Sequence, residues 1–513
     1  MYLEVLTMVL FDQGSIRRVE ALARLNHCNP FSQERIELER EVLGGAFVSS
    51  GTAWHREAGE AAVRPNIARI TNVAEEIANR ARESLQRGES AGAREIALYE
   101  SVVLYLLYNR YESKLREYIE SALVANANEP APIECYDAFC ADMAHYLNIR
   151  GYTFPGLAER EHLFACFFQL RRAFHHIFDN IIGGSTASAQ LRAATWQSIF
   201  TCDMARYRRT LYSRMNDVTT LITGPSGTGK ELVAKAIAYS GYIPFDARRK
   251  RPAEDFIRAY HPVNLSELSP TLIESELFGH VKGAFTGAMA DRAGYFEICH
   301  DHGTVFLDEL GELDPFIQVK LLRVVQDRTF RRVGETKSRP FRGKIVAATN
   351  RDLTEAVRSG RFREDLYYRL CSDTIRTPSL REQIAESREQ LRNLIRHVAQ
   401  RVAGEPEAKA LAEETDVWIW DHLPADYPWP GNVRELEQCV RNIMVRKSYV
   451  PTPFIDANRD IVLDELLACR LTAEELLGIY CRRVYEKTGS YSAAAKQLGL
   501  DRRTVKSHIS GRT

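Results

Sequence analysis

The chain has 513 residues, which at about 150 residues per domain predicts roughly three domains rather than one core. Hydrophobic residues make up 45% and charged residues 27%, a balance typical of globular proteins and unlike that of a disordered chain. Lys plus Arg and Asp plus Glu both total 68, which excludes a polycationic protein that coats nucleic acid but not a local basic module.

The sequence predicts a cytoplasmic protein. Its longest apolar run of note, 102–108, is far shorter than the ~20 residues that a membrane span needs. The N-terminal stretch has no cationic segment ahead of its apolar residues, which argues against a signal peptide. The 10 cysteines are irregularly spaced, as reduced thiols are, and do not suggest a disulfide framework.

Residues 1–182 predict a mostly helical domain, because apolar residues recur at helical spacing in 71–85 and 95–124. Cys135, Cys140 and His145 suggest a metal site. However, offsets of five on one helix point about 140° apart, so we favour buried thiols.

From 183 to 447 the pattern changes. Short β-rich runs at 218–224, 304–309 and 344–350 alternate with amphipathic helices, which predicts βαβ units around a parallel sheet. The expected fold class is therefore an α/β core with a parallel sheet. A stretch at 448–470 is interpreted as a linker.

A phosphate-binding loop is predicted between the strand 218–223 and a helix that starts near Lys230. Glycines there let backbone N–H groups approach a phosphate, and the helix N-terminus adds a favourable dipole. The Lys230 ammonium reaches the β- and γ-phosphates, whereas Glu231 stands where the general pattern has a Mg²⁺-binding hydroxyl. A Gly-rich turn without a ligand is the disfavoured alternative. The expected nucleotide-binding residues are Gly224, Pro225, Ser226, Gly227, Thr228, Gly229, Lys230 and Glu231.

Two acidic residues end the apolar run 304–307, beside the expected position of this loop. We expect Asp308 to hold Mg²⁺ through water and Glu309 to activate the attacking water. Asn350 ends the next apolar strand, where an amide would position the same water or the γ-phosphate. Solvated turn residues, or an N-cap for Asn350, are the alternatives.

In this order the motifs resemble the AAA+ ATPases that activate sigma-54 RNA polymerase, the bacterial enhancer-binding proteins. The resemblance covers about 183–447 and implies a helical lid at about 380–447, ATP hydrolysis, and ATP and Mg²⁺ as cofactors. The similar segments are 224–237 for Walker A, 303–334 for Walker B and the following helix, 347–350 for sensor I and 429–436 for sensor II.

The segment 283–288 reads GAFTGA, which is similar to the loop that distinguishes these activators from other AAA+ proteins. From the residues alone it is an exposed apolar loop of the kind that marks an interaction surface, and a buried turn is the alternative. The resemblance implies a contact with sigma-54. The expected contact residues are Gly283, Ala284, Phe285, Thr286, Gly287 and Ala288.

The resemblance also assigns roles to single polar residues. Arg363 and Arg369 are similar to arginine fingers, which act on a neighbouring subunit's γ-phosphate and therefore imply a ring, a hexamer by resemblance. Arg434 is similar to the sensor II arginine that contacts nucleotide. Asn264 is similar to the residue that restrains the catalytic glutamate and would hydrogen-bond Glu309 in one nucleotide state.

Residues 471–513 predict a DNA-binding module. They carry eight Lys or Arg against four Asp or Glu, although the whole chain is neutral. The stretch 491–509 has helix-turn-helix rhythm and resembles the Fis-type module of these activators, with Gly499 in the turn and Asp501 as cap. A basic hairpin used for oligomerisation is the alternative. The expected DNA-binding residues are Arg502, Arg503, Thr504, Lys506 and His508.

The resemblance implies a transcription activator that binds upstream DNA and uses ATP to remodel sigma-54 holoenzyme into the open complex. Residues 1–182 would regulate its activity, and the stretch 161–178 would form a helix packed against the ATPase domain. The basic stretch 245–260 is interpreted as a solvated insertion rather than a contact with DNA or a partner. The alternative function is a remodelling ATPase with a DNA-binding tail that does not act on sigma-54.

Overall fold

The computed structural model describes residues 10–12, 14–49, 65–125, 129–267, 269–451 and 472–510. It divides into two compact units, Met1–Ser448 and Tyr449–Thr513. The expected linker, 448–470, lies almost wholly outside the described residues. In the described part of the chain, no helix combines the length and apolar character needed to cross a membrane.

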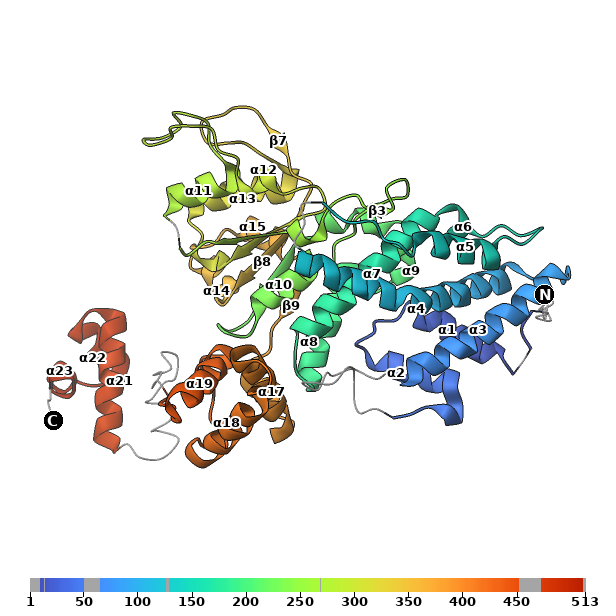
Figure 1. Cartoon of the computed structure of the whole chain (residues 1–513). Helices are drawn as coiled ribbons and strands as arrows, with labels where there is room; N and C mark the ends of the chain where they lie inside the picture. The colour runs from blue at the N-terminus through green and yellow to red at the C-terminus, as the bar shows by residue number, and fades with distance from the viewer. Residues whose placement is uncertain are drawn as a thin grey trace, which may run out of the picture. The chain divides into compact units, whose positions relative to one another are not determined.

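The N-terminal part of the first unit is helical, as the apolar spacing predicted. Its two longest helices begin six and two residues before the ranges expected from the sequence, and each ends one residue after them. The helices are α1 (Ile16–Leu25), α2 (Gln33–Leu43), α3 (Pro65–Gln86), α4 (Ala93–Ala125), α5 (Tyr136–Leu147), α6 (Pro155–Ala158), α7 (Arg160–Asn180), α8 (Thr186–Phe200) and α9 (Met204–Arg209) (Figure 1).

A five-stranded parallel sheet forms the centre of the α/β core, which confirms the predicted fold class. The strand order is β4-β5-β8-β1-β9. Side chains of β8 are buried along its whole length, because strands on both sides and helices on both faces cover it. The strands are β1 (Thr220–Thr223), β4 (Tyr260–Asn264), β5 (Thr304–Asp308), β8 (Lys344–Thr349) and β9 (Asp373–Arg376).

The connections between strands carry the helices of the core and two short antiparallel ribbons. The helices are α10 (Lys230–Ala238), α11 (Pro270–Phe278), α12 (Tyr295–Ile298), α13 (Pro315–Asp327), α14 (Leu353–Arg358) and α15 (Glu364–Leu370). The ribbons pair β2 (Phe245–Asp246) with β3 (Arg251–Pro252) and β6 (Thr329–Phe330) with β7 (Arg339–Pro340).

Helices α16 (Leu380–Ile384), α17 (Arg388–Ala403), α18 (Ala408–His422) and α19 (Asn432–Arg446) follow the sheet as a helical lid (Figure 1). Helix α16 begins with a capping box, in which the side chains of Ser379 and Glu382 each bond the other residue's backbone N–H. The described helices of the second unit are α21 (Ala473–Thr488), α22 (Tyr491–Leu498) and α23 (Arg502–Ser510).

Helix α7 joins the N-terminal helices to the α/β core, as expected for the stretch 161–178. Its Arg172 side chain is fully buried and donates hydrogen bonds to the backbone carbonyls of Tyr239 (2.9 Å) and Gly241 (2.7 Å), just beyond α10. Gln169 donates to the Ser240 carbonyl at 2.9 Å. Three successive carbonyls at the end of α10 therefore bind side chains of α7.

The stretch 245–260 is not a solvated insertion, so that prediction is wrong. Phe245 and Phe256 are buried in the core of the N-terminal helices, and the Phe245 ring lies 4.8 Å from that of Phe164. The Ile133 backbone N–H donates to the Lys250 carbonyl at 2.7 Å. The basic residues dominate the charge pattern of the stretch, but the aromatic residues near both of its ends decide its position, because they gain more from burial.

Candidate nucleotide site and partner loop

The phosphate loop lies between β1 and α10, where the sequence predicted it. Gly229 adopts a left-handed conformation (φ +88°) immediately before α10. The Lys230 ammonium donates to the carbonyls of Gly224 (3.0 Å) and Pro225 (3.1 Å), so it lies against the loop itself. Burial lowers the pKa of Lys230, and the nearby Glu309 and Asp308 carboxylates oppose this shift.

Two loop glycines are required by packing as well as by access for a phosphate. A Cβ on Gly224 would lie 2.1 Å from Thr377 Oγ1, and one on Gly227 would lie 2.4 Å from the Gly431 carbonyl. Thr377 also pairs its hydroxyl with that of Thr228 at 2.7 Å. The loop is thus held against the residue that follows β9 and against the start of the lid helix α19.

Asn432 joins the lid to the phosphate loop. It is buried and left-handed (φ +52°), a conformation that Asn tolerates better than most residues. Its Nδ2 donates to the Ser226 carbonyl at 3.0 Å, and its Oδ1 accepts from the Leu380 N–H at 2.9 Å. The neighbouring Arg434 reaches Ser226 Oγ at 3.3 Å. Arg434 therefore lies at the loop.

The acidic pair lies at the carboxyl end of β5. Burial raises the pKa of Asp308, whose Oδ1 accepts the Glu309 N–H at 2.9 Å. Glu309 has a left-handed backbone (φ +54°), which is unusual outside glycine and is found preferentially at functional sites. Asp308 and Glu309 both act electrostatically on Lys230, so the two motifs meet at one site.

Two amides lie at the same edge of the sheet. Asn264 ends β4 opposite Asp308, and exposed Asn350 follows β8. The Asn264 side chain donates to Glu267 (2.7 Å) and accepts from Ser266 (2.9 Å for the hydroxyl). The carboxyl ends of β4, β5 and β8 therefore bring both expected amides near the acidic pair, although Asn264 is not bonded to Glu309.

The two candidate arginine fingers lie at opposite ends of α15. Arg363 precedes the helix and binds Asp365 with two contacts, 3.0 Å from Nε and 2.7 Å from Nη2. Arg369 is exposed, and its guanidinium has no ion pair among the described residues. Neither arginine contacts the chain's own phosphate loop. Arg369 is the one whose charge is not already compensated.

The loop expected to contact sigma-54 closes on itself. His280 pairs with Arg292 at its base, and the Gly283 N–H donates to the Ala288 carbonyl at 2.9 Å. Gly283 and Gly287 are left-handed (φ +81° and +100°) with open space around them. The Phe285 ring is half-buried against His280, 5.0 Å between centroids, and Ala288 is buried. The exposed positions include Thr286 and, beyond the motif, Met289.

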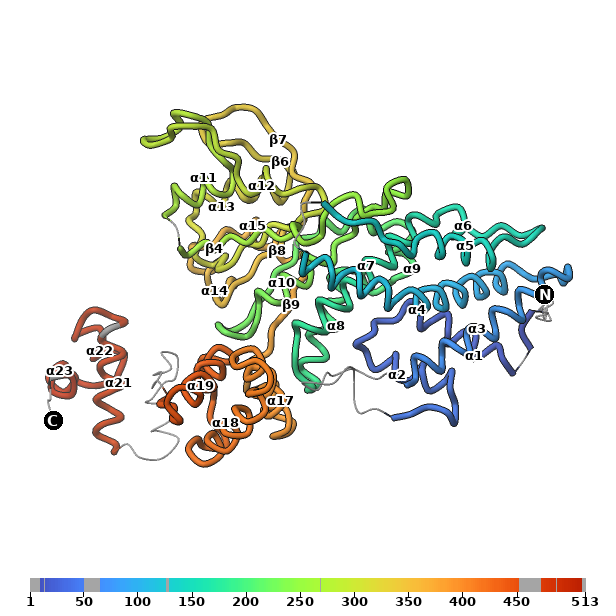
Figure 2. The backbone as a smooth tube through the Cα atoms, in the orientation of Figure 1, coloured from blue at the N-terminus to red at the C-terminus, as the bar shows by residue number. Residues whose placement is uncertain are grey.

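A second loop, 331–338 between β6 and β7, supports the first one (Figure 2). Val281 donates its N–H to the Val333 carbonyl at 3.1 Å. Gly334 approaches Ala284 so closely that a Cβ on Gly334 would lie 2.9 Å from the alanine Cβ. The GAFTGA segment therefore depends on a loop about fifty residues away in the sequence.

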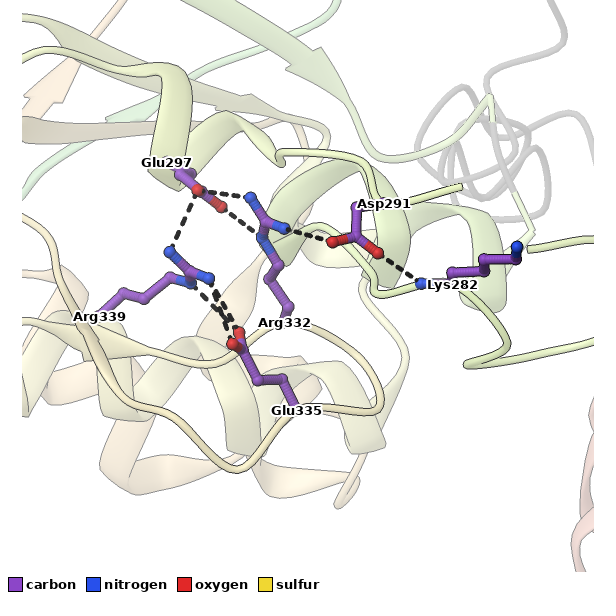
Figure 3. Close-up of polar contacts among 6 residues, drawn as sticks. All are labelled: Lys282, Asp291, Glu297, Arg332, Glu335 and Arg339. Atoms are coloured by element: carbon purple, nitrogen blue, oxygen red, sulfur yellow. Dashed lines mark hydrogen bonds and ion pairs between the residues drawn. The ribbon is translucent and has the colours of Figure 1, made fainter. Parts of the chain in front are cut away.

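Ion pairs tie the bases of both loops together (Figure 3). Arg332 binds Glu297 on α12 with two hydrogen bonds (2.8 and 2.6 Å) and lies 3.8 Å from Asp291. Asp291 accepts the Lys282 N–H at 2.8 Å, immediately before the GAFTGA segment. Arg339 adds ion pairs to Glu297 and Glu335. Such a charge network restrains loop geometry more than isolated surface pairs do.

The second unit is a compact helical module. Val484, Ala494, Ala495 and Val505 form its core, with Leu498 and Leu500 packed against them. Gly499 is left-handed after α22, and Asp501 Oδ1 accepts the N–H groups of Arg503 and Thr504. Arg502, Arg503 and Lys506 are exposed, whereas Thr504 and His508 are half-buried. The Thr504 hydroxyl is also bonded to Asp501.

The sequence prediction omitted Asn432, Thr377 and Met289. Asn432 lies within the segment 429–436 that resembles sensor II. An Asn directly after Pro-Gly is a signal for a turn or a left-handed backbone conformation. Thr377 and Met289 carry no such local signal.

Two family models match adjoining parts of the chain. Residues 201–376 match the sigma-54 interaction domain. Residues 385–458 match an AAA+ ATPase lid domain.

Named relatives are similar to part of the chain. The Nif-specific regulatory protein of Herbaspirillum seropedicae is 44% identical over 262 residues, which are 51% of this chain and 42% of that protein. The transcriptional regulatory protein ZraR of Escherichia coli K12 is 39% identical over 300 residues, 58% of this chain and 64% of that protein. The chain thus spans less than two thirds of the length of either relative.

Solved structures are similar as well. NtrX from Brucella abortus in complex with ATP is 24% identical, with a TM-score of 0.38 over 70% of this chain and 76% of that one.

Proposed function

We propose that this chain uses ATP hydrolysis to drive sigma-54 RNA polymerase into the open complex. It belongs to the sigma-54-dependent transcriptional activator family, because its core matches a sigma-54 interaction domain followed by an AAA+ ATPase lid domain. The observation that carries this proposal is the complete GAFTGA loop, supported by ion pairs on the same domain that holds the phosphate loop.

ATP hydrolysis is assigned to the edge of the sheet where the motifs meet. Lys230 would leave the loop carbonyls for the β- and γ-phosphates, and Arg434 would contact nucleotide from the lid. Asp308 is a partly buried carboxylate beside Lys230, which fits a Mg²⁺ held through water, and the ion would neutralise phosphate charge. Glu309 would orient the attacking water, with Asn350 and Asn264 as its polar neighbours.

Hydrolysis in this account requires a second subunit. A cation that stabilises transition-state charge in trans accelerates phosphoryl transfer by ~10³–10⁵. Arg369 is exposed and has no ion pair among the described residues, which suits that role, whereas Arg363 would first have to release Asp365. We therefore propose a ring, a hexamer by family resemblance, in which Arg369 completes the neighbour's site.

The partners are proposed to bind at two separate surfaces. The exposed tip around Thr286, with Met289 beside it, would contact sigma-54. The exposed cations Arg502, Arg503 and Lys506 would bind upstream DNA through α23. Thr504 and His508 would contribute less, because both are half-buried. Because its proposed partners are DNA and RNA polymerase, we propose that the protein acts in the cytoplasm.

Control of the ATPase is proposed to reside in the N-terminal helices. Arg172 and Gln169 on α7 bind carbonyls that follow α10, the helix that begins at Lys230. A shift of α7 would therefore be transmitted to the phosphate loop through one helix.

The test of the proposed chemistry is the Glu309→Gln substitution in the full-length chain. It keeps the shape of the side chain but removes the base, so ATP turnover should fall at least about a hundredfold while ATP still binds. Equilibrium binding of ATP and release of phosphate measure the two effects. Glu312→Gln, the same change at an exposed position three residues away, is the matched control. Undiminished turnover in Glu309→Gln would remove Glu309 from the mechanism.

A further inference from the structure

A cavity of about 700 Å³ lies among the N-terminal helices, apart from the nucleotide site. Helices α3, α4 and α7 line most of it, and residues of the α1–α2 region (Leu25 to Arg35), Trp196 of α8 and Met204 of α9 contribute the remainder. Figure 1 shows where these helices lie in the N-terminal part of the chain. Its volume is within the range of about 300–1,000 Å³ that is usual for pockets that bind small organic molecules. The size alone does not identify a ligand, but the polar atoms in the wall do.

Three buried side chains of this wall have polar atoms without a hydrogen-bond partner. Tyr105, Arg171 and Trp196 are 5%, 6% and 5% exposed, and Tyr105 Oη, Arg171 Nε and Trp196 Nε1 make no hydrogen bond. A buried polar group without a partner is costly, and such groups in native proteins call for an explanation.

Arg171 Nε and Trp196 Nε1 can only donate a hydrogen bond, and the Tyr105 hydroxyl can donate one, so acceptors on a ligand would satisfy all three. Some polar side chains of the wall already have partners: Arg171 Nη1 binds Glu112 at 2.6 Å, and His175 lies 2.9 Å from Asp179. The lining contains three Arg and three Asp or Glu residues: Arg35, Arg116, Arg171, Glu112, Glu120 and Asp179. The wall therefore offers donors without a strong excess of charge.

The remainder of the wall favours a flat apolar body. Aromatic rings contribute a large part of it, and aromatic side chains stack on planar groups with little loss of side-chain freedom. The Arg171 guanidinium itself lies over the Phe174 ring, 5.4 Å from its centroid. The aromatic residues that line the cavity are Tyr105, Tyr108, Phe174, Phe178 and Trp196.

We propose that this cavity is a binding site for a small organic molecule with a flat apolar body and oxygen acceptors, either a carboxylate or an amide-type carbonyl. The acceptors bind Tyr105, Arg171 and Trp196, and the body packs among the rings. The site lies on α7, whose other face holds the end of α10 through Arg172 and Gln169. Binding itself does not depend on the proposed function of the ATPase.

Calorimetric titration of the full-length chain with three probes tests the proposal. 1-Naphthaleneacetate, 1-naphthaleneacetamide and 2-(1-naphthyl)ethylamine share one ring body and differ in the group that they present. We expect saturable binding of the acetate, the acetamide or both, one per chain, and none of the amine, which brings donors to donors. Binding of the acetate alone assigns a carboxylate, and binding of the acetamide shows that a neutral carbonyl suffices.

Two conservative variants connect binding to these atoms. Tyr105→Phe and Trp196→Phe each keep an aromatic ring but lose the donor, so affinity for the bound probe should fall about tenfold. Trp420→Phe, at a 61% exposed tryptophan of α18, should leave affinity unchanged. The melting temperature of each variant verifies that it folds. Three results would overturn the proposal: no saturable binding of acetate or acetamide up to about 1 mM, equal binding of the amine, or unaltered affinity in both variants.

Discussion

At the residue scale, the Asn432 side chain links three segments that are far apart in the sequence. It bonds the phosphate loop at Ser226 and the first lid helix at Leu380 while starting α19. Its left-handed backbone excludes most other residues from this position. Small polar side chains of this kind commonly fix the geometry of a site without taking part in its chemistry.

Asn432→Ala should therefore destabilise the chain and weaken ATP binding together. Loss of the side chain leaves the Leu380 N–H and the Ser226 carbonyl without these bonds, and alanine is strained at this backbone angle, which together should cost about 2–4 kcal/mol. Urea unfolding and ATP titration measure the two effects. Asn442→Ala, at a half-buried position of the same helix, is the control, since its amide bonds the Gln438 carbonyl of its own helix. Similar behaviour of the two variants would show that Asn432 does not hold the loop.

Lys344 gives a residue-scale prediction about pH. Burial at the start of β8 lowers the pKa of Lys344 from 10.5 to about 8, with Asp373 opposing the shift, and its ammonium donates to the carbonyls of Met215 and Val218. Between these pKa values the unfolded chain binds a proton that the folded chain has lost. Raising the pH from about 8 to about 10.5 should therefore increase stability, by up to about 3 kcal/mol from this group.

The difference between wild type and Lys344→Met isolates this contribution. Methionine has similar length but does not titrate, so the wild type should gain stability relative to the variant as pH rises through this window. Urea unfolding at several pH values gives the comparison. If the difference between the two proteins is the same at every pH, Lys344 is not titrating as the structure implies.

At the element scale, the GAFTGA loop and the 331–338 loop form one unit, held by Arg332 between Glu297 and Asp291. Arg332→Gln removes the charge that holds Glu297 and Asp291 together, so the loop should lose its fixed geometry. We expect ATP turnover to stay within about twofold, because the site at β5 is untouched, while open-complex formation with sigma-54 polymerase falls more than about fivefold.

Arg331→Gln is the matched control for that prediction. Arg331 is the adjacent residue, is exposed, and has no ion pair among the described residues. If both variants lose open complexes equally, then open-complex formation depends on the positive charge of the loop and not on the ion pairs that Arg332 makes.

How far the sequence predicts these elements depends on the range of the contacts. The phosphate loop, the strand ending in Asp308 and the turn at Gly499 follow from adjacent residues, and the structure has them within two residues of the expected positions. The support of the GAFTGA loop by Arg332 and the joining of lid and loop by Asn432 depend on residues tens to hundreds of positions away. No local periodicity encodes such contacts, which is also why Phe245 and Phe256 were misread as parts of a solvated stretch.

At the scale of the whole molecule, the proposed hydrolysis requires subunits that complete each other's sites. Arg369→Ala should lower turnover by about 10³ although its own phosphate loop is intact, and Lys230→Ala should be inactive although its Arg369 is intact. Mixing the two variants in equal amounts should restore roughly a quarter of wild-type activity. In randomly formed rings, about one interface in four combines an unmutated phosphate loop from one subunit with an unmutated Arg369 from its neighbour. Phosphate release measures the activity, and size-exclusion chromatography verifies that the variants assemble together. A mixture no more active than its components would exclude action in trans by Arg369.

Helix α7 connects the N-terminal helices to the α/β core. Arg172 is completely buried, and burial lowers its pKa to about 9. Its guanidinium keeps two backbone carbonyls as partners, so this contact is built into the core and is not a loose surface association. The N-terminal helices and the α/β core are therefore packed against each other at this contact.

The most direct test of the central claim is ATP-dependent open-complex formation by sigma-54 RNA polymerase holoenzyme with the full-length chain, measured beside phosphate release in the same reactions. The account predicts that wild type both hydrolyses ATP and opens the promoter, and that Thr286→Ala, at the exposed tip of the loop, hydrolyses ATP but opens little. Hydrolysis by wild type without any promoter opening would contradict the account, since the ATPase would then work on something other than sigma-54.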